Sequence, residues 1–103
     1  MYFDKRKYLV QITGGKGLTN TETLRGMVVH MIVRPQSSDT MWDLTIYDKE
    51  QDEMVEIVGH TGRFDEQSGI PLGKDTQEML TIHFKNVTRN EPIKVIFKTK
   101  EIE

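Results

Sequence analysis

The sequence predicts an all-β fold, an antiparallel β-sandwich, and three observations support this. Apolar and polar residues alternate in several short segments, among them Trp42–Tyr47, Leu80–Lys85 and Ile93–Lys98. Successive side chains of a strand point to opposite faces, so this alternation indicates sheets with one buried side. The connections between segments are short and rich in turn-forming residues, which favours antiparallel pairing, because a parallel crossover needs a dozen or more residues. No stretch has a convincing helical period.

The first two strands are expected before residue 36. One runs from about Lys7 to Thr13 and is ended by the glycines of residues 14–17. The other, from about Leu24 to Arg34, is apolar on both faces, which is typical of a central strand covered on both sides. Pro35 ends it, because proline cannot donate a hydrogen bond to a neighbouring strand. Residues 19–23 between them form either an edge segment or a loop.

Two hairpins are expected to complete the sheets. Their polar connections are residues 48–53 and 88–91, and a long loop with several glycines, residues 59–78, lies between them. The four strands are Met41–Tyr47, Met54–Val58, Met79–Val87 and Pro92–Ile102. Short strands at this spacing indicate a sandwich of about six to eight strands, and an immunoglobulin-like one is the first choice although the usual cysteine pair is missing.

Length and charge favour one domain that spans residues 1–103, with residues 1–6 as an N-terminal arm. The formal net charge is −2. This balance argues against a nucleic-acid binder, which needs excess Lys and Arg to displace counterions from phosphates. The chain has no cysteine, which excludes disulfides and thiolate chemistry. We expect neither a signal peptide nor a membrane span, because no apolar run is long enough.

The glycine-rich residues 14–17 superficially resemble a phosphate-binding loop. They fail the pattern because Gly17 follows Lys16 where Ser or Thr should stand, and Val10 occupies the position of the first glycine. No helix is expected after this segment to support a bound anion. We therefore interpret it as a turn and predict no cofactor.

The histidines do not predict a metal site. His30, His60 and His83 lie far apart, so three distant strands would have to converge on one ion. Alternation places His83 on a solvent-facing side and makes His30 a partly buried histidine with a hydrogen bond.

Calcium at the first hairpin tip is the main alternative among metals. Asp48, Glu50 and Asp52 carry oxygen ligands at alternate positions, but the segment lacks the glycine and the terminal glutamate of an EF-hand. No Ser–His–Asp set can be assembled either. We expect no metal ligand and no catalytic residue, and hence no enzyme.

Two segments are expected to be free to contact partners. Tyr2 and Phe3 lie on the basic arm before the first strand, and Arg63 and Phe64 lie in the long loop. Rings can fill apolar pockets on a partner and cations can meet its acidic groups. We therefore predict these residues as partner-binding, whereas Trp42 is expected in the core.

Several motifs spread over most of the chain resemble small β-sandwich structural proteins of tailed-bacteriophage virions. They are Thr23-Leu24-Arg25-Gly26, Thr45-Ile46-Tyr47-Asp48, Gly62-Arg63-Phe64, Ile70-Pro71-Leu72-Gly73 and Thr81-Ile82-His83-Phe84-Lys85-Asn86-Val87-Thr88. The resemblance implies a head-decoration, neck or tail component, made in the host cytoplasm and placed in the virion. It also implies a multi-copy assembly in which the chain binds copies of itself and other capsid, neck or tail subunits, without nucleic acid or membrane.

The alternative function is a carbohydrate-binding or adhesin-type module on the same type of sandwich. Such modules usually present several aromatic rings on one exposed face, where sugars stack. Trp42 and Tyr47 are the aromatic residues near each other in sequence, and alternation places them on opposite faces. A non-enzymatic virion structural protein is therefore the leading expectation.

Overall fold

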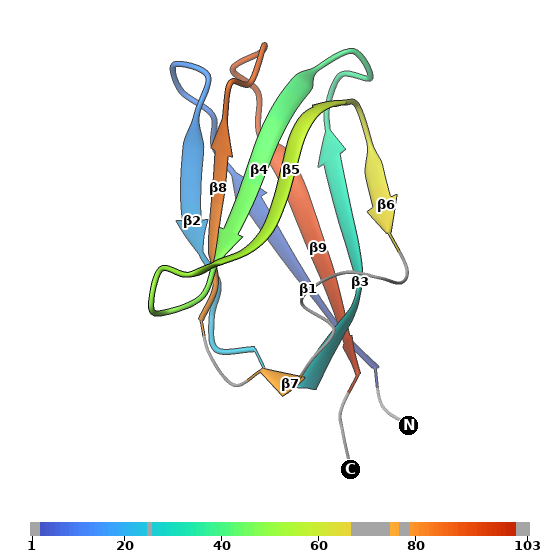
Figure 1. Cartoon of the computed structure of the whole chain (residues 1–103). Helices are drawn as coiled ribbons and strands as arrows, with labels where there is room; N and C mark the ends of the chain where they lie inside the picture. The colour runs from blue at the N-terminus through green and yellow to red at the C-terminus, as the bar shows by residue number, and fades with distance from the viewer. Residues whose placement is uncertain (1–2, 25, 67–74, 77–78, 101–103) are drawn as a thin grey trace.

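The computed structural model describes residues 3–24, 26–66, 75–76 and 79–100, which form nine strands and no helix (Figure 1). In chain order the strands are β1 (Phe3–Val10), β2 (Gly17–Asn20), β3 (Gly26–Pro35), β4 (Met41–Tyr47), β5 (Glu53–Thr61), β6 (Phe64–Glu66), β7 (Asp75–Thr76), β8 (Thr81–Lys85) and β9 (Ile93–Lys100).

The strands form two antiparallel sheets that pack face to face. One has the order β1-β9-β3-β6, with β7 also paired to β3, and the other has the order β2-β8-β4-β5. Figure 1 shows β2, β8, β4 and β5 as the front layer, with β1, β9 and β3 running behind them. The predicted all-β, antiparallel sandwich is confirmed.

The strand order is that of a jelly roll. Most consecutive strands lie in opposite sheets, and β4 and β5 are the consecutive pair that lie side by side. Two sheets of four main strands connected in this way form the double Greek key of jelly rolls. An immunoglobulin domain instead groups its strands as ABED and CFG. The sandwich is as expected, but its connections differ from the immunoglobulin-like order.

The second predicted hairpin is wrong. β8 pairs with β4 and β2, whereas β9 lies in the other sheet between β1 and β3. Residues 86–92 therefore cross from one sheet to the other. Sheets in a sandwich lie about 10 Å apart, a distance that a link of this length spans as easily as it closes a hairpin. Alternation could not distinguish the two, because both strands bury one side in the same core.

Several strand boundaries also differ from the prediction. β6 and β7 lie within the predicted long loop, where they are too short to show a repeating pattern. Residues 3–6, predicted as part of a free arm, belong to β1 and pair with β9, Phe3 opposite Lys100 and Arg6 opposite Phe97. Charged residues hid this part of the strand, because Asp4, Lys5 and Arg6 follow one another without an apolar alternation.

The core lies between the sheets and receives alternate residues from both. Trp42 and Phe84 of the front sheet are fully buried and pack edge to face, with ring centroids 5.7 Å apart. Phe97 of β9 is fully buried in the opposite sheet. The indole Nε1 of Trp42 donates a 2.8 Å hydrogen bond to the carbonyl of Gly62, so its polar atom is satisfied inside the core. The prediction that Trp42 is a core residue is confirmed.

Candidate interaction surface

The predicted partner-binding residues differ in whether the structure leaves them accessible to a partner. Tyr2 lies outside the described residues, and Phe3 begins β1, where its backbone pairs with β9. Phe64 packs against the core, with its ring centroid 6.3 Å from that of Trp42 and 5.4 Å from that of His60. Arg63 is exposed and its Nη2 lies 3.1 Å from Oδ2 of Asp65. Arg63 is thus accessible to a partner, whereas the ring of Phe64 is used in packing.

The three histidines lie in separate surroundings. His30 on β3 is half-buried and hydrogen-bonded to Asp65 of β6, which confirms the sequence prediction for it. His60 contacts the Trp42 ring and is hydrogen-bonded to the carbonyl of Arg63. His83 lies on the outer side of β8, opposite Thr45. In the part of the chain that the structure describes, no three His, Asp or Glu side chains gather as metal ligands would.

Residues 13–16 form a tight turn. Thr13 and Lys16 exchange backbone hydrogen bonds across it, and Gly14 and Gly15 both have positive φ. The backbone N–H of Gly15 donates to the side chain of Asn90, and its carbonyl accepts from Val87. The turn is fastened to the neighbouring loop, as a structural turn would be.

The tip of the β4–β5 hairpin also has a structural explanation. Oδ1 of Asp48 accepts hydrogen bonds of 2.9 Å from the backbone N–H groups of Glu50 and Asp52. This is the turn-forming role that aspartate commonly has. The carboxylates of Glu50, Asp52, Glu53 and Glu56 in the same hairpin are exposed to solvent.

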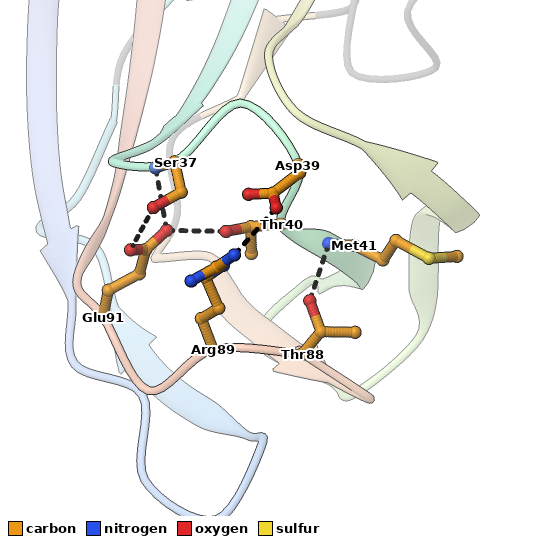
Figure 2. Close-up of polar contacts among 7 residues, drawn as sticks. All are labelled: Ser37, Asp39, Thr40, Met41, Thr88, Arg89 and Glu91. Carbon is orange, nitrogen blue, oxygen red and sulfur yellow. Dashed lines mark hydrogen bonds and ion pairs between the residues drawn. The ribbon is translucent and has the colours of Figure 1, made fainter.

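A polar cluster joins two loops at one end of the sandwich (Figure 2). The carboxylate of Glu91 accepts hydrogen bonds from the backbone N–H and hydroxyl of Ser37 and from the hydroxyl of Thr40, over 2.7–2.9 Å. The Thr40 hydrogen bond is the largest cause that holds the pKa of Glu91 below its ordinary value, and those from Ser37 add to it. The cluster ties the β3–β4 connection to the β8–β9 connection, both of which cross between the sheets.

Beside this cluster lies an open hollow of about 340 Å³, lined by Asp39, Met41, Thr88 and Arg89. Arg89 Nη2 lies 2.7 Å from Oδ2 of Asp39, and Thr88 exchanges two hydrogen bonds with the backbone of Met41. Figure 2 shows these groups directed at one another. The polar groups that line the hollow thus pair with one another, Arg89 with Asp39 and Thr88 with Met41.

The outer side of the β1-β9-β3 sheet has a different character. Residues directly opposite each other in antiparallel strands point to the same face, and alternate residues along a strand share it. The registers therefore bring six cations to one side of the sheet, a surface that we call the basic face: Lys5, Lys7, Arg34, Lys94, Lys98 and Lys100. Among the residues whose side chains are described, Asp65 is the carboxylate on this side, and it is bonded to His30 and Arg63.

Like charges lie opposite one another on the basic face. Lys98 on β9 has Lys5 opposite it on β1, and Lys94 lies opposite Arg34 on β3. Like charges in such positions destabilise a sheet. None of the six cations has an ion pair within the described residues. Within the described residues, the sheet therefore retains a repulsion that no ion pair relieves.

Protection of the sheet edge explains only part of this charge. β1 is an edge strand, and lysines there discourage pairing with another chain. That reason accounts for Lys5 and Lys7. It does not apply to Lys94 and Lys98, because β9 lies between β1 and β3 and both of its edges are paired.

Two isoleucines lie on the same side of the sheet as the cations. Ile32 and Ile96 lie opposite each other on the outer side of the sheet, yet they are only 5% and 1% exposed. Long lysine side chains can cover apolar surface with their stems while their ammonium groups stay in water. The basic face thus has an apolar centre that is closed to solvent. Its sequence signal was the alternation of lysines along Ile93–Lys100, but strand register was needed to place the other cations beside them.

The chain matches no protein-family model, and a search of curated proteins gave no significant match. In the described residues, no helix is long and apolar enough to cross a membrane.

Proposed function

We propose that this chain is a non-enzymatic structural protein that binds neighbouring protein subunits in a multi-copy assembly. The specific form of the proposal is a component of a tailed-bacteriophage virion, in its head, neck or tail. The observation that carries the binding role is the basic face, where cations of a central strand lie opposite other cations. An anionic partner surface would relieve this repulsion.

The architecture supports the proposal at a coarser level. Jelly rolls are common in viral capsid proteins, although the same fold also serves lectins and cupins. The virion location rests on the sequence resemblance, and the basic face supplies a surface suited to contact with other subunits. Charged surfaces of this kind guide association and fix the relative orientation of partners.

The carbohydrate-binding alternative has less support. A sugar platform needs exposed rings on one side, but Trp42 is fully buried and bonded inside the core. Tyr47 lies on the outer side of β4, with its ring centroid 6.5 Å from that of His83. Among the described residues this gives one aromatic ring for a sugar face, and it lies beside a histidine.

The test is the protein content of purified native particles. Quantitative mass spectrometry is expected to find this chain in many copies per particle. A second preparation should use Lys94→Glu with Lys98→Glu, for which we expect reduced incorporation. Lys16→Glu with Lys85→Glu makes the same change in net charge away from the basic face and should incorporate normally. Recovery of the chain solely as a free monomer, with none in particles, would overturn the proposal.

A further inference from the structure

The hairpin that joins β4 to β5 carries the opposite charge to the basic face. Between residues 48 and 56 the chain has one lysine, Lys49, and five carboxylates, a segment that we call the acidic hairpin: Asp48, Glu50, Asp52, Glu53 and Glu56. Asp48 is used in the turn, but Glu50, Asp52, Glu53 and Glu56 are exposed. In Figure 1 the connection between β4 and β5 extends away from the body of the sandwich.

The acidic hairpin cannot neutralise the basic face of its own molecule. It belongs to the β2-β8-β4-β5 sheet, whereas the basic face is the outer side of the other sheet. The core lies between the two, since each sheet buries its inner side against the other. Only a hairpin from another molecule can reach the basic face.

We propose that the basic face is the docking site for the acidic hairpin of a second copy of this chain. This inference rests on the proposed assembly role and names the partner. The contact joins two different surfaces, so each copy still has one free basic face and one free acidic hairpin. Such a head-to-tail contact produces a ring if its rotation closes and an open chain if it does not.

The dimensions suit a hairpin. From Lys94 to Lys100 the face extends roughly 20 Å along β9, and from β1 to β6 it extends roughly 14 Å across the strands. A two-stranded tip fits within this area. A stable interface buries about 800 Å² on each partner, which is more than a hairpin tip supplies. The single contact is therefore weak and salt-sensitive, and it becomes effective when several copies are held together.

Other properties favour protein over nucleic acid as the partner. The whole chain has a formal net charge of −2, so the acidic hairpin would repel a polyanion that approached the basic face. The centre of this face is formed by Ile32 and Ile96, which are closed to solvent and offer no polar group to a base or a phosphate.

The test is exchange of charge between the two surfaces. The face variant carries Lys94→Glu and Lys98→Glu, and the hairpin variant carries Glu50→Lys and Asp52→Lys. Sedimentation velocity over a range of concentrations measures association at low salt and at about 1 M salt, where the Debye length falls to about 3 Å. Circular dichroism verifies that each variant is folded. Lys16→Glu with Lys85→Glu is the control for net charge.

We expect the unmodified chain and the control to associate at low salt and to dissociate at high salt. Each variant alone should associate more than about tenfold more weakly, because like charges then face each other. An equimolar mixture of the two variants should regain association, as should one chain that carries all four substitutions. Association of both single variants at the unmodified level would overturn the inference.

Two further results would also overturn it. One is an unmodified chain that stays monomeric at low salt yet is found in purified particles, which would leave the proposed function intact with a different partner. The other is retention of the unmodified chain, but not the face variant, by duplex DNA in the absence of self-association. That result would assign the basic face to phosphate groups.

Discussion

The outer faces of the two sheets differ in how their charged groups are partnered. On the β2-β8-β4-β5 sheet, Asp43 accepts hydrogen bonds of 2.7 Å from the N–H of Gly59 and 2.8 Å from the side chain of Asn86, and it lies opposite Lys85. On the β1-β9-β3 sheet, Lys98 lies opposite Lys5 and has no ion pair within the described residues. Asp43 is thus partnered within the chain, whereas Lys98 lies opposite a like charge.

The difference separates charges that stabilise the fold from charges that repel one another within it. Removing a buried partner leaves its bonded groups unsatisfied and destabilises the protein. Removing one of several like charges has the opposite effect, because repulsion decreases. Removing a charge should therefore lower the free energy of unfolding on one outer face and raise it on the other. Truncating a core residue should lower it on the inner side of either sheet.

The largest expected effect tests whether the inner sides of the two sheets contribute alike to stability. Phe84 of β8 and Phe97 of β9 are both fully buried, one from each sheet. Replacing either with Ala should lower the free energy of unfolding by about 3–5 kcal/mol, through lost burial and the cavity left behind. Urea unfolding followed by circular dichroism measures both. A small effect for Phe97→Ala alone would mean that the basic sheet is not packed against the other.

The next largest effect is expected for Asp43→Asn on the outer side of the β2-β8-β4-β5 sheet. The amide offers one oxygen in place of two, so one of the hydrogen bonds from Asn86 and Gly59 is lost, at a cost of about 1–3 kcal/mol at neutral pH. The hydrogen bond from Asn86, followed by that from Gly59, holds the pKa of Asp43 below its ordinary 3.8.

This lowered pKa fixes the pH dependence. The stabilisation by Asp43 is complete well above pH 3.8, the ordinary value of an aspartate, and is lost as the pH falls through the lower pKa of the folded state. The difference between the unmodified chain and Asp43→Asn should therefore shrink in acid. Urea titrations at neutral and acidic pH check this, and a difference that stays constant would show that the charge of Asp43 contributes nothing.

Part of this fold could be predicted from the sequence because one-sided burial leaves a period of two. Met41–Tyr47 coincides with β4 for that reason, and the core positions of Trp42 and Phe84 follow from it. β6 and β7 were missed because three or two residues cannot show a period. The jelly-roll order was missed because a short link closes a hairpin and crosses between sheets with similar ease.

The basic face was missed for a related reason. Lys94 and Lys98 alternate visibly along one strand, but Lys5 was interpreted as part of a free arm. That Lys5 lies opposite Lys98 is a property of register between segments more than ninety residues apart, which local pattern does not contain. The same holds for His30, whose hydrogen bond was predicted but whose partner Asp65 was not.

A smaller effect is expected on the inner side of the basic sheet, at Tyr8. Its buried hydroxyl finds no hydrogen-bond partner in the described part of the chain, and its ring centroid lies 6.0 Å from that of Phe97. Burial, with the charge of Glu22 as the next cause, raises the pKa of Tyr8 to about 12.

Tyr8→Phe keeps the ring and removes the unpaired hydroxyl, so stability should stay the same or rise by up to about 1 kcal/mol. Because the folded pKa is raised, the unmodified chain should lose stability as the pH rises above 10, the ordinary value, whereas Tyr8→Phe should not lose this part. A marked loss of stability in Tyr8→Phe at neutral pH would reveal a partner for the hydroxyl. Thermal unfolding at neutral and alkaline pH distinguishes the two outcomes.

The smallest effect is the most direct test of the two outer faces, because one substitution should have opposite signs on them. Lys98→Gln removes a cation that lies opposite Lys5, and should raise the free energy of unfolding by roughly 0.2–1 kcal/mol. Lys85→Gln removes a cation that lies opposite Asp43, and should lower it by a similar amount. Glutamine keeps most of the side-chain stem, so apolar surface remains covered in both variants.

Urea unfolding at low salt, at a protein concentration where the chain is monomeric, measures both variants. Both differences should diminish in about 1 M salt, since exposed charges are then screened beyond about 3 Å. A loss of stability in Lys98→Gln, like that expected for Lys85→Gln, would mean that Lys98 is partnered after all, and the reason to seek an anionic partner for the basic face would be lost.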